Sequence, residues 1–498
     1  MSSGSGTEAE HWPAGDHSRL ALGTGALLAF SILLGWTISG PNGLLVAAAV
    51  IGVVILIGLV WAFQRDPTGT LLGFWIFQLF LVPASALVGY TSPLGESLRQ
   101  GTDVITGALV VLVAWSLYSH RRFPGPLRYV VAGIGVGVCG LASSLVAHGG
   151  ATVTAEGAWL GLKVWTLIAI ALCIQWRPAD VSRIFSVFRR VGICVALIGI
   201  VDYFTHGGVA AILHTNVLTN GVVTYRSDSI SAIFATPGEY SLCMSLMFGV
   251  TLASYATMRQ RRDLAAALLF AVAVAFSFRL KGALSIGAAM AVVTMCKSRR
   301  RRGNFAGLVA LFVILGAGLV TFEGNVISRQ FNTYTAGASD ANARGLLYQA
   351  SEKIAVQHFP FGVGFGRFGS FASSQPYSTV YDQYGLSGVW GLSRPHPQFI
   401  SDTSWPSVLG ETGAVGLLCF FGGIMALGCA AYARFRRGPI DREPITLALL
   451  CAIAVLLVDS LGAPSLFDWF AATTIALLSG PALSGWAEAA TKDRPRSL

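Results

Sequence analysis

The sequence Gly362-Val363-Gly364-Phe365-Gly366-Arg367-Phe368-Gly369 lies within a long polar interruption, from about residue 322 to 405, between two apolar segments. A loop longer than about 12–15 residues without evident structure of its own is usually functional or disordered. This one contains too many aromatic residues for a disordered segment. We therefore expect residues 322–405 to form an ordered loop that covers a functional site.

The composition of the 498-residue chain places most of it in lipid. Hydrophobic residues make up 54% and charged residues only 12%, whereas an ordinary soluble protein has about 25% charged residues. A membrane-spanning helix needs roughly 20 apolar residues, and about fourteen such segments fit the sequence. They are centred near residues 29, 52, 80, 110, 138, 167, 197, 248, 271, 290, 313, 417, 453 and 475. The predicted fold is an all-α, polytopic integral membrane protein.

The distribution of basic residues predicts the topology. Connections rich in Lys and Arg, such as 121–128, 259–262 and 297–302, alternate along the chain with connections that are poor in them. Because Lys and Arg are enriched on the cytoplasmic side of membranes, both termini are predicted to be cytoplasmic and the large loop to be outside. The formal net charge of +10 is thereby explained by topology, and no nucleic-acid partner is expected.

The predicted organisation has five parts. They are a cytoplasmic N-terminal tail (1–19), transmembrane helices (20–321) with an outer loop at about 205–239, the large extracytoplasmic loop (322–405), C-terminal transmembrane helices (406–484) and a cytoplasmic tail (485–498).

The sequence predicts neither a nucleotide-binding site nor a metal site. The glycines of 364–369 fit the pattern Gly-x-Gly-x-x-Gly, but a dinucleotide site also needs a preceding strand and a following helix. These glycines instead predict a tight turn at the membrane surface. The eight cysteines fall in or at the ends of apolar segments and show no metal-ligand spacing. We expect neither a metal nor a cofactor.

Three arginines on the predicted outer side are candidates for binding an anion. Arg279 lies between two spans with almost no loop between them, and a cation in such a place usually has a function. Arg226 and Arg344 lie in outer loops, the latter near the start of an amphipathic helix predicted over 341–358 on the membrane surface. Guanidinium groups match phosphate oxygens well, so the three would suit a diphosphate if they converge. Alternatively, each is a solvated or headgroup-bound charge.

Two carboxylates and a histidine are candidate catalytic residues. Asp402 precedes an apolar segment, where Asp402, Thr403 or Ser404 can cap the incoming helix, with Pro406 in the first turn. Glu411 lies inside that segment, and intramembrane ionisable groups are costly and usually functional. His396 lies in the loop between two prolines. The alternative is that Asp402 is only a cap and that Glu411 pairs with an arginine in a structural role.

Four aromatic residues of the loop region are candidates for sugar binding. Flat rings suit sugars because they offer apolar area with a polar edge. Tyrosine and tryptophan are also common in interfacial belts, so both explanations stay open. The four residues are Tyr377, Tyr381, Tyr384 and Trp405.

At these residues the chain resembles the O-antigen ligase/polymerase (Wzy-like) superfamily of bacterial membrane glycosyltransferases. The resemblance rests on four pieces, which follow one another in order. They are Arg226 with Phe234–Glu239, the turn Ser277–Ala283, Arg344 with His358–Gly366, and Asp402-Thr403 leading to Gly410–Gly416.

The resemblance implies a GT-C-like enzyme that works without a metal and inverts the transferred sugar. Its donor would be a polyprenyl-diphosphate-linked glycan, which explains why no nucleotide site is present. Arg226, Arg279 and Arg344 would bind the diphosphate, and Asp402, Glu411 or His396 would be the general base. The closing motif of the family's ligases usually begins with histidine. Asp402 occupies that position here, which favours a polysaccharide polymerase.

The sequence therefore predicts a polymerase of O-antigen or exopolysaccharide type at the outer face of the bacterial plasma membrane. Its expected partners are the lipid-linked oligosaccharide, a glycan acceptor, membrane lipid and a candidate chain-length regulator. Two alternatives remain at this stage. One is a ligase that transfers the glycan to a different acceptor, and the other is a flippase for the same lipid-linked glycan.

Overall fold

The computed structural model describes residues 129–213, 230–297, 343–374, 376–438 and 440–484, together with 65–87 and a few residues between 58 and 110. The chain divides into two compact units, Met1–Arg65 and Asp66–Leu498. All the helices discussed below belong to the second unit.

The described part of the chain is all-helical and contains no strand, as predicted. Its long helices are α3 (Pro67–Leu87), α5 (Val131–Val146), α6 (Ala151–Cys173), α7 (Pro178–Phe204), α9 (Pro237–Met258), α10 (Arg261–Phe276), α11 (Leu280–Lys297), α16 (Trp405–Arg437), α17 (Glu443–Asp459) and α18 (Trp469–Leu483). The remaining α-helices, α8 (Gly208–Ile212), α14 (Ala343–Gln357) and α15 (Val380–Gln383), lie in connections.

Five of these helices are long and apolar enough to cross a membrane, namely α6, α7, α9, α11 and α16. The length and composition of these helices therefore indicate a polytopic membrane protein. The total of about fourteen spans stays a prediction. The predicted spans centred near residues 29, 52 and 313 lie outside the described residues, and the one near 110 is described only in fragments.

The basic connections gather at one end of the helices. The start of α10 is tied to α7 by an ion pair between Asp263 and Arg189 with an N–O distance of 2.5 Å. Lys297 at the end of α11 pairs with Glu443 at the start of α17 at 2.7 Å. Arg434 near the end of α16 donates to the carbonyl oxygen of Ser484 at 3.0 Å. The residues predicted to face outward, such as Arg279, lie at the opposite end of the same helices.

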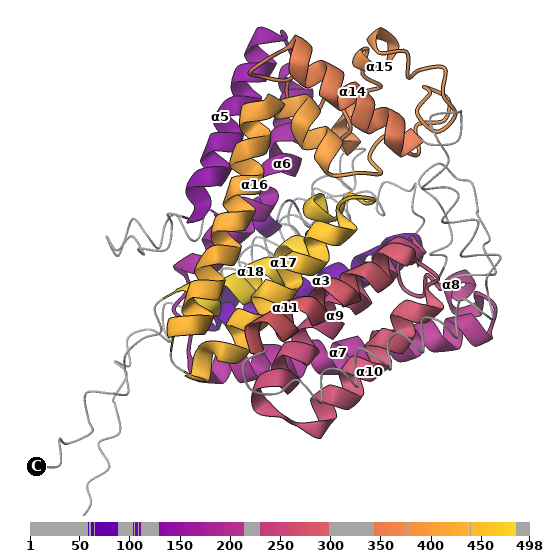
Figure 1. Cartoon of the computed structure of the whole chain (residues 1–498). Coiled ribbons are helices and arrows are strands. Elements are labelled where there is room, and N and C mark those ends of the chain that lie inside the picture. The colour runs from indigo at the N-terminus through magenta and orange to yellow at the C-terminus, as the bar shows by residue number, and fades with distance from the viewer. Residues whose placement is uncertain are drawn as a thin grey trace, which may run out of the picture. The chain divides into compact units, whose positions relative to one another are not determined.

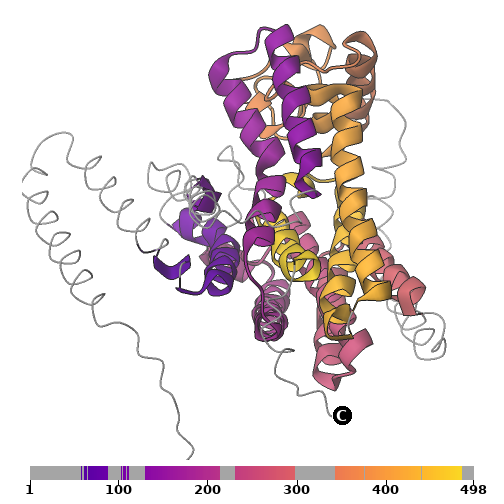
Figure 2. The ribbon, with the colours of Figure 1, turned by 90° about the vertical axis from the view of Figure 1, so that its left-hand side faces the viewer.

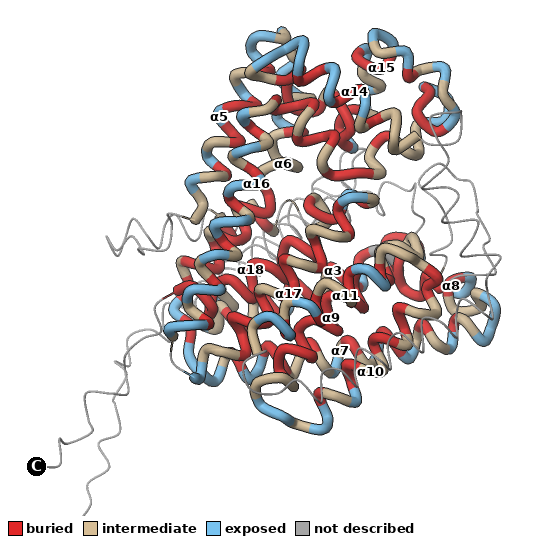
Figure 3. The backbone as a smooth tube through the Cα atoms, viewed as in Figure 1, coloured by how far each residue is buried: buried red, intermediate tan, exposed pale blue. Residues whose placement is uncertain are grey.

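An apolar stripe on α5 faces away from the protein. Ile134, Val138, Leu141 and Leu145 follow one another at three- or four-residue spacing, and between 48% and 79% of each is exposed. Figure 3 shows this exposed side of α5. A stripe of this kind suits contact with lipid chains, where backbone groups are satisfied inside the helix and the side chains are apolar.

The large loop has a small core of its own. The helix predicted over 341–358 is present as α14, and its apolar residues Leu347 and Ile354 pack with Phe368, Tyr381 and other residues of the loop. The expectation that this apolar face lies on the membrane surface is wrong, because the face is covered by the loop core. Figures 1 and 2 show α14 and α15 over one end of α5, α6 and α16.

The helix α16 is interrupted at Gly413, and the glycine-rich segment of the loop fills the interruption. Gly413 has φ 73° and ψ −172°, a conformation that is essentially restricted to glycine. The freed carbonyl oxygen of Gly410 accepts from the Val363 N–H at 2.8 Å, and that of Glu411 accepts from Gly364 at 3.0 Å. The predicted tight turn is therefore also a backbone partner for a broken helix.

Close approach of the two backbones explains why glycines occur on both sides of this contact. A Cβ atom on Gly413 would lie 2.3 Å from the carbonyl carbon of Phe361, and one on Gly362 would lie 2.2 Å from the carbonyl oxygen of Gly410. Two serine hydroxyls of α5 bind the same glycine-rich segment. Ser143 Oγ accepts from the Gly362 N–H at 3.1 Å, and Ser144 Oγ accepts from Phe365 at 2.9 Å.

We predict that Gly413→Ala destabilises the protein, because alanine is strained at this φ and its Cβ would meet the backbone of Phe361. Such strain costs about 1–3 kcal/mol. Gly422→Ala is the matched control, since Gly422 lies in the same helix with open space around it, where alanine is favoured by about 0.5–1 kcal/mol. Thermal unfolding of both variants in detergent measures the difference. Equal transition temperatures would contradict the assignment.

Candidate active site

Asp402 and Arg344 form an ion pair at the junction between the loop and α16. Arg344 lies in the first turn of α14, and Asp402 lies just before α16. The Asp402 Oδ2 atom accepts from Arg344 Nε at 2.7 Å and lies 2.5 Å from Nη2. The side chain of Arg344 is 30% exposed and that of Asp402 is 28% exposed. Within the described part of the chain, no donor reaches the second oxygen, Oδ1, so it can accept a hydrogen bond from a substrate.

The alternative that Asp402 is only a helix cap is wrong. Its carboxylate binds Arg344, and no side chain caps the first turn of α16. Pro406 is in the first turn, as expected. Capping of α16 therefore does not explain the presence of Asp402, and capping was the simplest alternative to a catalytic role.

Two further cations act on Asp402. Arg279 lies between α10 and α11, and Lys281 lies in the first turn of α11. Burial raises the pKa of the Asp402 carboxyl above its ordinary value, and the charges of Arg344, Lys281 and Arg279 oppose that rise. The Asp402 carboxylate therefore interacts with positive charges from two parts of the chain, the start of α14 and the start of α11. Arg226, the third predicted arginine, lies outside the described residues.

A buried ion pair supports Lys281. Its Nζ atom lies 3.3 Å from the carboxylate of Asp459 at the end of α17, and that carboxylate also accepts from Ser465. Asp459 is 1% exposed, so the pair holds a positive charge in place close to Asp402. The start of α9 is adjacent, since a Cβ on Gly238 would lie 3.4 Å from Lys281 Nζ.

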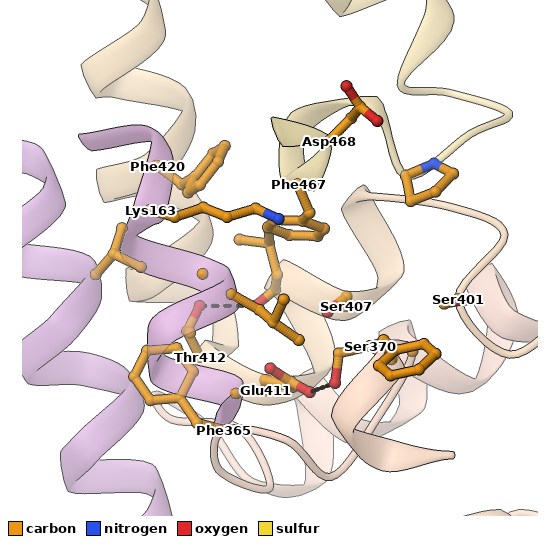
Figure 4. A pocket seen from close by; sticks show the side chains of 18 of the residues that line it. Lys163, Phe365, Ser370, Ser401, Ser407, Glu411, Thr412, Phe420, Phe467 and Asp468 are labelled. Atoms are coloured by element: carbon orange, nitrogen blue, oxygen red, sulfur yellow. Dashed lines mark hydrogen bonds between the residues drawn. The ribbon is translucent and has the colours of Figure 1, made fainter. Parts of the chain in front are cut away.

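Glu411 holds the glycine-rich segment onto α16. Its side chain is 3% exposed, and its Oε1 atom accepts from Ser370 Oγ at 2.6 Å and from the Phe368 N–H at 3.3 Å. Figure 4 shows the bond to Ser370. These partners come from the loop, so Glu411 does not have the arginine partner that the structural alternative supposed, as far as the described residues show.

His396 lies in a tight turn of the loop. It is exposed, its backbone bridges to Ser393, and its ring is 6.3 Å from that of Trp390. The structure places it with loop residues and gives it no contact with Asp402 or Arg344 within the described residues.

The predicted sugar-binding aromatics have different surroundings. Tyr381 is fully buried in the loop core, and its hydroxyl accepts from the Gly369 N–H at 2.8 Å. Its ring is stacked on Phe368, so it is a packing residue. Tyr377 and Tyr384 are half-buried and donate to Leu392 and Gln357 respectively.

Trp405 lies in the first turn of α16 and joins it to the end of α17. Its Nε1 atom donates to Ser460 Oγ at 2.9 Å, and its ring packs edge-on against Phe420 and Phe421. Both contacts are structural, and its half-buried ring still has accessible surface.

A cavity of about 310 Å3 lies beside this junction, between α6, α16, the glycine-rich segment and the connection from α17 to α18. Ser401, the neighbour of Asp402, is part of its lining, together with Glu411 and Ser370. Figure 4 shows the side chains around it. No local sequence pattern predicts this cavity, because its walls come from separate parts of the chain.

Comparison with protein families matched residues 243–421 to the family described as O-Antigen ligase. The matched segment contains Arg279, Arg344, Asp402 and Glu411, but it begins after Arg226. No curated protein matched the chain.

We predict that Tyr381→Phe lowers stability by about 1–3 kcal/mol, the usual cost of leaving a buried polar group unpaired, because the Gly369 N–H loses its acceptor. Tyr384→Phe, which removes a hydroxyl bound to the exposed Gln357, should change stability by a few tenths of a kcal/mol. Unfolding of the two variants in parallel checks this. An equally small effect in both would show that Tyr381 is not a core residue.

Proposed function

We propose that the chain is a polysaccharide polymerase, since residues 243–421 match the family described as O-Antigen ligase. It would transfer glycan from a polyprenyl-diphosphate-linked donor to a sugar hydroxyl of an acceptor at the outer face of the plasma membrane. The observation that carries the proposal is the Arg344–Asp402 pair, set beside Arg279 and Lys281 within the matched segment.

The cations provide a place for the diphosphate. A lipid diphosphate carries several negative charges, and guanidinium groups bind phosphate oxygens through paired N–H donors. Arg344 and Arg279 would bind the diphosphate directly, with Lys281 adding a compact charge held by Asp459. In the transition state negative charge grows on the departing diphosphate, and preorganised cations stabilise that charge.

Asp402 would act as the general base. The acceptor hydroxyl attacks the anomeric carbon of the donor sugar, its proton passes to Asp402 Oδ1, and the bond from that carbon to the diphosphate oxygen breaks with its electron pair. A single displacement of this kind inverts the anomeric configuration. No residue in this scheme needs a metal or a nucleotide.

Asp402 suits this role better than the two alternatives. Asp402 is paired with Arg344, whereas Oε1 of Glu411 accepts from Ser370 and Phe368 of the loop that it anchors. His396 lies in an exposed turn beside Trp390. Asp402 is also the residue on which the cations act, and a base must lie close to the reacting donor.

The proposal is tested with purified protein, a synthetic polyprenyl-diphosphate oligosaccharide and no added metal or nucleotide. A ladder of products in multiples of the repeat unit supports the polymerase. Single transfer to a different added acceptor would instead identify a ligase. If the donor is unconsumed with every acceptor offered, the proposal fails, and transport of the lipid-linked glycan becomes the explanation to pursue.

We predict that Asp402→Asn lowers the transfer rate by about 10²–10⁴-fold, the usual contribution of a general base, while the protein stays folded in the membrane. Asp382→Asn is the control, since Asp382 lies in the same loop, is half-exposed and pairs only weakly with Arg394 at 4.0 Å. Initial rates on the lipid-linked donor measure both. Full activity of Asp402→Asn would place the base elsewhere.

The pH dependence of the rate gives an independent check. The base works only when ionised, so the rate falls as pH drops through the pKa of Asp402, which burial raises above its ordinary value. Arg344 opposes that rise. Arg344→Gln should therefore move the acidic limb of the profile to higher pH, whereas Arg394→Gln, a substitution of an exposed arginine in the same loop, should not. An unchanged limb in Arg344→Gln would exclude Asp402 as the titrating group.

A further inference from the structure

The cavity beside the Arg344–Asp402 pair has walls with two kinds of chemistry. Aromatic rings form much of it, including Phe365, Phe371, Phe467 and Trp469. Polar side chains interrupt these rings, and several of them come from α16. The volume of about 310 Å3 is at the lower end of the range of small-molecule sites, which is roughly 300–1,000 Å3.

Lys163 directs a buried charge into this cavity. It lies in the middle of α6 and is 3% exposed, and its Nζ atom lies 4.6 Å from the centre of the Trp469 ring. Among the described residues, no hydrogen-bond acceptor or ion-pair partner reaches that atom. An ammonium group has three donors, and burying it without acceptors is costly. Figure 4 shows its tip among the lining side chains.

A second polar group faces the cavity from the opposite helix. Ser407 of α16 is 2% exposed and lines the cavity, yet its hydroxyl has no hydrogen bond within the described part of the chain. Lys163 and Ser407 thus come from different walls. The ammonium group of Lys163 has the Trp469 ring and the charges of Asp468 and Asp103 near it, but neither this group nor the Ser407 hydroxyl has a hydrogen-bond partner among the described residues. A molecule with several oxygen atoms between them would supply those hydrogen bonds.

The lining favours a neutral sugar ring over other occupants. A pyranose has an apolar face for an aromatic ring and hydroxyl oxygens that both donate and accept. A lipid chain would leave Lys163 and Ser407 unsatisfied. A phosphate would meet the carboxylates of Glu411 and Asp468, which also line the cavity.

We propose that this cavity is the acceptor-sugar subsite, which binds a neutral pyranose through Lys163 Nζ and Ser407 Oγ against the aromatic wall. The inference rests on the proposed function, because it takes Asp402 as the base. Ser401 in the lining is the chain neighbour of Asp402, and on this proposal a hydroxyl of the bound sugar reaches that carboxylate. The diphosphate of the donor then occupies the side of Asp402 where Arg344, Arg279 and Lys281 lie.

The test measures sugar binding without any donor, so it does not depend on transfer activity. Saturation-transfer NMR on the full chain in nanodiscs would use the methyl glycosides of glucose, galactose, mannose and N-acetylglucosamine as probes. At least one should bind to the unsubstituted protein. Lys163→Met should weaken that binding about tenfold or more, as expected for a hydrogen bond from a charged group, and Leu160→Trp, which fills the cavity, should abolish it.

Lys353→Met is the matched control, because Lys353 lies exposed on α14. It should bind the probe as the unsubstituted protein does. Binding of none of the four sugars, or binding that persists in Lys163→Met, would overturn the proposal. If a sugar binds as expected but no product ladder forms with lipid-linked donor, the subsite stands and the polymerase assignment fails.

Discussion

The structure depends on the backbone contact between the glycine-rich segment and the broken helix α16. The interruption of the helix at Gly413 frees the carbonyl oxygens of Gly410 and Glu411. The N–H groups of Val363 and Gly364 donate hydrogen bonds to these oxygens. Unpaired backbone groups are too costly in a membrane protein to be left without partners. This contact therefore fixes the loop onto α16, and the loop core in turn holds α14, so that Arg344 meets Asp402 58 positions along the chain.

Two of the cations at the junction, Lys281 and Arg344, each have a carboxylate partner. Isolated charges in a low-dielectric interior are very unfavourable, and removing one member of a buried pair typically costs about 3–5 kcal/mol. Lys281 is balanced by Asp459 and Arg344 by Asp402. Such pairs are weak evidence for stability, since apolar residues would hold the helices together equally well. On the proposed function, their presence at the end of the helices away from the basic turns would serve a site that binds an anionic substrate.

Local features were predictable from sequence, and long-range ones were not. The helix at 343–357, the start of α9 at Pro237 and the short turn before Arg279 follow from spacing, proline placement and apolar length. Hydrophobic composition likewise predicted an all-helical membrane protein. The partners of Asp402 and Lys281 depend on contacts between residues 58 and 178 positions apart, which no local pattern encodes. Tyr381 carries the same aromatic signal as Tyr377, and only its burial in the loop core separates the two.

On the proposed mechanism, the same cations would stabilise the leaving diphosphate and weaken the base, and donor binding would resolve this conflict. Positive charges near Asp402 stabilise its ionised form and thereby make it a weaker base. On the proposed mechanism, the donor diphosphate brings negative charge to Arg344, Arg279 and Lys281 and cancels much of their effect on Asp402. The pKa of Asp402 then rises, so the carboxylate becomes a stronger base only when donor is bound. On this mechanism, an acceptor hydroxyl in the neighbouring cavity would be activated only when there is an anomeric carbon for it to attack.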